Sequence, residues 1–198
     1  MLCVCLGAGV LCGRFLFTGE QAALAGGPLL TASLSLLVLA VGIRMGSDKT
    51  LPAKVRERGP GVLLVPAGVV AGSLLGGLLA GLLTGMEAHL AGAVAAGFGW
   101  YSISAVILQE LAGNQAATLA FLANVFRELL AFAVIPLAAR FLGDYPAIAP
   151  GGATAMDTTL PVILRSTDEA TGAAAVITGV ICSALAPFLV TLIYGLGG

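Results

Sequence analysis

The chain has 198 residues, of which 59% are hydrophobic and only 10% are charged, whereas an ordinary soluble domain carries about 25% charged residues. Because so few charges cannot cover a water-facing surface, we expect a membrane protein. The net charge of −1 does not suggest a nucleic-acid-binding protein, which usually carries an excess of basic residues. The four cysteines lie in apolar runs without the spacing of a zinc site or a disulfide framework, so we expect neither a metal nor another cofactor.

The N-terminal part of the chain, residues 1–84, is expected to form membrane-spanning helices. Apolar segments that approach the roughly 20 residues needed to cross a bilayer occur at residues 2–17, 28–45 and 61–84. The loop of residues 44–58 carries five basic side chains, and the positive-inside rule therefore places it in the cytoplasm.

The remaining part, residues 85–198, contains two segments that cannot be continuous lipid-facing helices. Residues 89–111 hold the run GFGWYSIS at positions 97–104, and residues 147–166 are rich in Gly, Pro and Thr. Irregular backbone at membrane depth is tolerated only where protein or water covers it, because each unpaired peptide group in hydrocarbon costs several kcal/mol. We therefore expect an internal cavity in this part of the chain.

The two broken segments also resemble each other. Each precedes a long apolar span, at residues 115–140 and 171–195, and Gly99 and Pro136 match Gly152 and Pro187 at similar offsets. Paired interrupted segments are typical of inverted-repeat transporters.

The placement of basic side chains favours one topology. If every segment spans the membrane, Arg140 lies outside, whereas two re-entrant hairpins entering from opposite faces place both Arg140 and Arg165 inside. We therefore predict an all-α membrane protein with about five transmembrane helices and two broken or re-entrant segments, like an inverted-repeat transporter.

Two acids within apolar segments are the main candidates for function. Glu128 lies near the middle of the 115–140 span, and Asp157 lies in the second broken segment. Ionisable groups at that depth cost at least about 2.5 kcal/mol, so they usually face a cavity and have a function. Two converging carboxylates could bind a cationic solute when ionised and release it when protonated. The alternative is that Arg127 pairs with either acid as a structural link.

Polar groups near these acids could bind the polar groups of an amino acid. Asn124 lies one helical turn before Glu128 and shares its face. The others are Trp100, Tyr101, Ser102, Ser104, Arg127, Gly152, Thr154, Thr158 and Thr159. In the alternative, the hydroxyls bond to their own helices and the two aromatic rings anchor the chain at the membrane interface. We expect no enzyme, because the sequence has no nucleophile–base arrangement and Gly151-Gly152 follows no strand.

Three runs resemble the lysine exporter LysO family in order and spacing: GFGWYS at 97–102, FRELLA at 126–131 and GGATAMDTTLP at 151–161. The resemblance implies export of L-lysine and lysine analogues across the inner membrane of a bacterium, in exchange for protons. It also implies that Glu128 and Asp157 occupy the positions of the family's functional intramembrane acids. Longer family members carry further N-terminal helices, so we expect a homodimer or a small partner subunit. The alternative function is a passive channel, or a structural subunit of a larger membrane complex.

Overall fold

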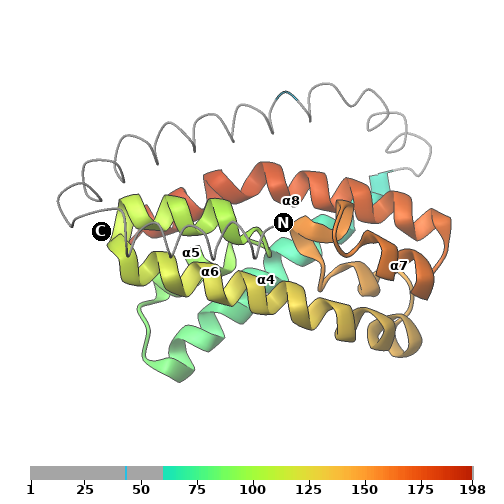
Figure 1. Cartoon of the computed structure of the whole chain (residues 1–198), viewed down its shortest axis with the longest axis horizontal. Coiled ribbons are helices and arrows are strands. Elements are labelled where there is room, and N and C mark those ends of the chain that lie inside the picture. The colour runs from blue at the N-terminus through green and yellow to red at the C-terminus, as the bar shows by residue number, and fades with distance from the viewer. Residues whose placement is uncertain (1–42, 44–59, 198) are drawn as a thin grey trace, which may run out of the picture. The chain divides into compact units, whose positions relative to one another are not determined.

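The computed structural model describes residue 43 and residues 60–197. The expected spans at 2–17 and 28–45 and the basic loop 44–58 lie outside the described residues, apart from the helical Ile43. The described residues from 60 onward belong to one compact unit, residues 45–198. Helices and turns make up this described part, with no strand in it, as Figure 1 shows.

The first long helix confirms the predicted span at 61–84. A short 3-10 helix, η1 (Pro60–Leu63), leads into α4 (Leu64–Thr84). The helix ends at Gly85, whose φ of 71° and ψ of 17° give the left-handed conformation common after a helix C-terminus. With 21 residues, α4 is long and apolar enough to cross a membrane.

Helix α6 (Tyr101–Leu142) is 42 residues long, but it reverses direction at Gly113. The backbone of Gly113 is non-helical, with φ 82° and ψ −175°. Ser104 Oγ lies 3.2 Å from Asn124 Nδ2, and the rings of Tyr101 and Phe121 are 5.5 Å apart. Residues twenty positions apart would be separated by about 30 Å in a straight helix. The element is therefore two antiparallel helices, residues 101–112 and 114–142.

The first broken segment is a helical hairpin. Helix α5 (Ala88–Ala95) ends in a turn at residues 96–99, and the helix at 101–112 follows. Val94, Gly99 and Ser104 all hydrogen-bond to one side chain, Asn124. The chain therefore runs in and back out, and the tip of this first hairpin, residues 96–100, lies against the middle of the 114–142 helix.

The second broken segment is also a hairpin. It consists of the 3-10 helices η2 (Pro146–Ile148) and η3 (Gly152–Met156) and of α7 (Leu160–Ser166), and the long helix α8 (Glu169–Gly195) follows. A Cβ on Gly179 of α8 would touch Met156, and one on Gly172 would touch Leu164. The return arm thus packs along α8, and the tip of this second hairpin is residues 152–159.

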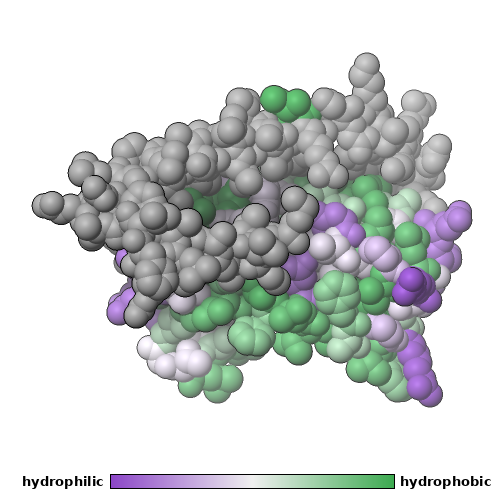
Figure 2. All heavy atoms as spheres, viewed as in Figure 1, coloured by the Kyte–Doolittle hydropathy of each residue, from purple (hydrophilic) through white to green (hydrophobic). Residues whose placement is uncertain are grey.

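Arg140 and Arg165 lie at the same end of this unit. They occupy the last turns of α6 and α7. One buried cluster joins η1, the end of α6, η2, α7 and the start of α8 through Val62, Ile135, Ala138, Ile148, Ile163 and Ala174. Figure 2 shows hydrophilic side chains gathered at this end of the visible face, with apolar side chains over much of the body.

Three helices of the described part, α4, the 114–142 helix of α6, and α8, are long and apolar enough to cross a membrane. The prediction of an all-α membrane protein is confirmed. The shared end of Arg140 and Arg165 is the one that the two-hairpin topology requires. The functional division into residues 1–84 and 85–198 stays a prediction.

Candidate transport site

The tips of the two hairpins touch each other. The backbone N–H of Ala153 in the second tip donates to the carbonyl oxygen of Phe98 in the first, at 2.9 Å. Gly152 has a φ of 57°, and a Cβ there would fall on that carbonyl oxygen and 2.9 Å from Arg127 Nη2. This position therefore requires glycine. We call this contact between Phe98 and residues 152–153 the tip crossing.

Asn124 supports the first tip through hydrogen bonds of its side-chain amide. Its side chain is 3% exposed. Its Oδ1 accepts from Gly99 N–H at 2.7 Å, and its Nδ2 donates to the Val94 carbonyl at 3.1 Å, to Ser104 Oγ at 3.2 Å and to the Ala120 carbonyl at 2.9 Å. The amide thus has a partner within the protein for its oxygen and for both of its hydrogens.

Arg127 holds the second hairpin. Its Nη1 donates to Ser73 Oγ on α4 at 2.8 Å, its Nη2 to the Ala149 carbonyl at 3.2 Å and its Nε to the Pro150 carbonyl at 3.4 Å. Among the described residues the salt bridge joins His89 to Glu87, and Arg127 forms none with Glu128 or Asp157. The structural link that Arg127 makes is therefore to a hydroxyl and to backbone carbonyls.

Tyr101 lies within electrostatic range of both Glu128 and Asp157. Glu128 is half-buried on the 114–142 helix and Asp157 is exposed just after η3. Asp157 Oδ1 accepts from the N–H of Thr158 at 2.6 Å and from its hydroxyl at 3.2 Å. Two acids and a phenol from three elements thus gather beside the tip crossing.

The hydroxyl groups divide into two sets. Ser104, Thr154 and Thr159 donate to nearby backbone carbonyls at 2.9–3.0 Å, as the structural alternative predicts. Ser102 is half-buried and Thr158 is exposed, so they are the hydroxyls here that a solute could reach.

The two aromatic residues at the first tip occupy different surroundings. Trp100 packs, partly buried, against the core cluster of Phe98 and Ala153, so it lies at the tip and not at either end of the unit. The Tyr101 ring makes an edge contact with Phe121, which fixes the phenol beside the two acids.

Two structural contacts were missed in the sequence analysis. Ser73 was not among the predicted site residues, although a hydroxyl in the middle of the largely apolar helix α4 could have signalled a polar partner. The bond to the Phe98 carbonyl joins two backbone groups, so no side chain in the sequence indicates it. The residue has a φ of 51°, which is uncommon without glycine, and its position between Gly97 and Gly99 marks a bent backbone.

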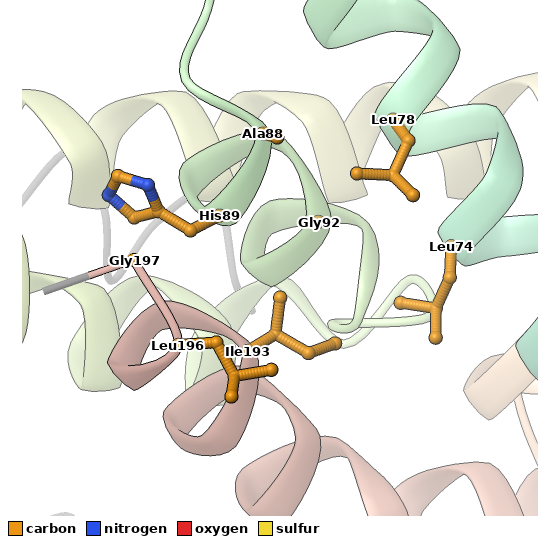
Figure 3. Close-up of a pocket in the computed structure, with 8 residues that line it drawn as sticks. All are labelled: Leu74, Leu78, Ala88, His89, Gly92, Ile193, Leu196 and Gly197. Atoms are coloured by element: carbon orange, nitrogen blue, oxygen red, sulfur yellow. The ribbon is translucent and has the colours of Figure 1, made fainter.

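Cavities flank Arg127 on two sides. One of about 310 Å³ lies between α4, α5 and the 114–142 helix, and one of about 720 Å³ lies along α4 and the 114–142 helix next to Pro150. A third, of about 450 Å³, is shown in Figure 3. Its lining is Leu74, Leu78, Ala88, His89, Gly92, Ile193, Leu196 and Gly197. None of the three linings includes a carboxylate, so Glu128 and Asp157 lie outside these three cavities.

Sequence comparisons with known proteins find lysine exporters. The family model described as lysine exporter LysO matches residues 3–194. The lysine exporter LysO of Escherichia coli (strain K12) is 37% identical over 159 residues, which are 80% of this chain and 52% of that protein. A Haemophilus influenzae protein named "Putative lysine exporter" is 38% identical over 99 residues, 49% of each chain.

The chain therefore spans about half the length of the curated relatives that it matches. No solved structure matches it. The matching family is one of exporters and not of enzymes. Since its model covers nearly the whole chain, the chain belongs to the lysine exporter LysO family.

Proposed function

We propose that this protein is a multi-pass secondary transporter of a bacterial inner membrane, exporting L-lysine and lysine analogues by proton antiport. The names of both relatives refer to lysine export, and the described part of the chain has three helices apolar enough to span a membrane. In this proposal Glu128 and Asp157 bind the substrate and the proton, and Arg127 and Asn124 support the two hairpins.

The observation that carries the proposal is that Tyr101, which follows the first tip, lies within electrostatic range of both Glu128 and Asp157, the latter in the second tip. Transporters built from inverted repeats place their sites where broken segments meet, because unwound backbone offers polar groups there. The two acids supply negative charge at this place, and a cationic amino acid is the complementary solute.

Exchange follows from the chemistry of a carboxyl group. An ionised carboxylate binds the ammonium group of lysine, whereas a protonated one has lost that attraction. Proton entry from outside thus favours substrate release, and proton loss to the cytoplasm restores the binding state. Ser102 and Thr158 are placed to contact the polar groups of the substrate.

A runner-up function is a passive channel, or a structural subunit that acts only in a larger complex. In this alternative the chain acts together with a second copy or a small partner subunit. A channel would let lysine move down its own gradient, with no dependence on protons.

Lysine efflux from loaded cells that lack their own lysine exporter tests the proposal. Expression of the chain should increase the efflux rate, and a protonophore should abolish the increase. Glu169→Gln, on an exposed residue at the start of α8, is the matched control and should behave as the parent. Efflux that persists with the protonophore would favour the channel.

A further inference from the structure

Arg127 lies at the point where three separate parts of the chain meet. Its three hydrogen bonds reach Ser73 on α4 and the carbonyls of Ala149 and Pro150 in the second hairpin. Its Cδ lies 3.9 Å from where a Cβ on Gly99 would be, and its Nη2 lies 2.9 Å from where one on Gly152 would be. Its side chain therefore passes between the tips of both hairpins.

The carbonyls that Arg127 binds belong to a break between η2 and η3. In a continuous helix such carbonyls would accept from N–H groups of the next turn. In broken membrane helices of other transporters, free carbonyls of this kind coordinate a coupling cation such as Na⁺. Here the guanidinium group, a cation attached to the chain, donates to both of them.

The positive and negative charges near the tip crossing point in different directions. Arg127 and Glu128 are adjacent, and adjacent helical residues point about 100° apart. Arg127 contacts α4 and the break, while Glu128 lies within electrostatic range of Tyr101. The positive charge is thus bound into the framework, and the negative charges are left on the side of the phenol.

We propose that Arg127 is a positioning residue, a built-in cation that occupies the carbonyl site of the second hairpin and fixes the tip crossing, and that it neither binds substrate nor neutralises the two acids. Because this inference deepens the proposed function, it rests on that function for its transport readout. The carbonyl site then needs no exchangeable metal cation, so export should be independent of Na⁺.

Chemical rescue is the direct test, since the cavities of about 310 and 720 Å³ beside Arg127 give a small cation room to enter. The variant is Arg127→Ala and the probe is methylguanidinium at millimolar concentration. The matched control is Arg140→Ala, which removes an exposed arginine near the ring of Phe141 at the end of α6. Thermal melting in detergent and lysine efflux are measured with and without the probe.

We expect Arg127→Ala to melt at a lower temperature and to lose at least tenfold in efflux rate, with methylguanidinium restoring both in part. The parent and Arg140→Ala should not respond to the probe. If methylguanidinium restores the melting temperature of Arg127→Ala but the parent chain exports no lysine, the proposed function is refuted and the role of Arg127 stands. No response of Arg127→Ala in either measurement would overturn the inference.

Arg127→Lys covers the case in which the alanine variant does not fold. A lysine keeps the charge but cannot reach three acceptors with one planar group. We expect the maximal efflux rate to fall severalfold, while the lysine concentration at half-saturation stays within twofold. A changed half-saturation with an unchanged maximal rate in Arg127→Lys would show that Arg127 contacts substrate. If Arg127→Gln is inactive and the double variant Arg127→Gln/Glu128→Gln is active, Arg127 neutralises the acid. Either result overturns the inference.

Discussion

The backbone N–H of Ala153 donates a 2.9 Å hydrogen bond to the carbonyl oxygen of Phe98, and this bond joins the tips of two hairpins that are remote in the sequence. Each hairpin is followed by a long helix that supports its tip. Asn124 of the 114–142 helix supports the first tip, and Gly179 of α8 packs against Met156 in the second. Both halves thus consist of a hairpin followed by a long helix, and they meet at the irregular backbone of the two tips.

Gly152→Ala should disrupt this crossing more than the same change at another left-handed glycine. An alanine with positive φ costs about 1–2 kcal/mol, and at Gly152 the added methyl group would also fall on the Phe98 carbonyl oxygen. Overpacking of this kind adds about 1–3 kcal/mol. We expect a clear fall in melting temperature together with loss of export.

The control for that change is Gly85→Ala. Gly85 has a φ of 71°, but nothing lies within 4 Å of its added Cβ, so only the conformational cost applies. Melting of both variants in the same detergent separates the two effects. Equal melting temperatures for the two variants would mean that the tips do not touch in the folded protein.

Asn124→Asp should destabilise the first hairpin although the side chain keeps its shape. The change removes the donors to the Val94 and Ala120 carbonyls and to Ser104. A buried group left without its partner costs about 1–3 kcal/mol. Asn114→Asp is the control, because Asn114 is exposed and its Oδ1 accepts from Gln109 at 3.1 Å, a role that a carboxylate retains. A larger loss of melting temperature at Asn114 would contradict the support role of Asn124.

The two acids are expected to be needed for export and not for folding. Glu128→Gln and Asp157→Asn should each abolish lysine efflux while leaving membrane abundance nearly normal, because neutralising an acid in an apolar region removes a desolvation cost. Breaking a buried ion pair would instead cost about 3–5 kcal/mol, and Arg127 forms no such pair with either acid among the described residues. Depleted variants that Arg127→Gln restores would refute this assignment.

The hairpin topology predicts which residues share a side of the membrane. In a cysteine-free background, Asp144→Cys and Thr167→Cys should be labelled from the cytoplasm, because they flank the second hairpin at the end that carries Arg140 and Arg165. Glu87→Cys and Asn114→Cys flank the first hairpin and should be labelled from outside. Labelling of Asp144→Cys from outside only would refute the topology.

The sequence predicts the elements of this fold better than their contacts. The span at 61–84 and both broken segments are visible locally, since apolar length and Gly-, Pro- and Thr-rich runs depend on neighbouring residues. The bond from Arg127 to Ser73 joins residues 54 positions apart, and no periodicity specifies it. Asn124 shows the same limit, because its helical face was predictable but the tip that it would support was not.

Lysine transport by the purified chain alone, in liposomes, tests the central claim most directly. Vesicles loaded with labelled lysine are diluted into buffers of equal or lower external pH, and efflux is compared for the parent, Glu128→Gln, Asp157→Asn and Glu169→Gln. Proton antiport predicts faster efflux from the parent and from Glu169→Gln when the outside is more acidic, and background efflux from the other two. Efflux that ignores the pH gradient, or no efflux from the parent chain, would contradict the account.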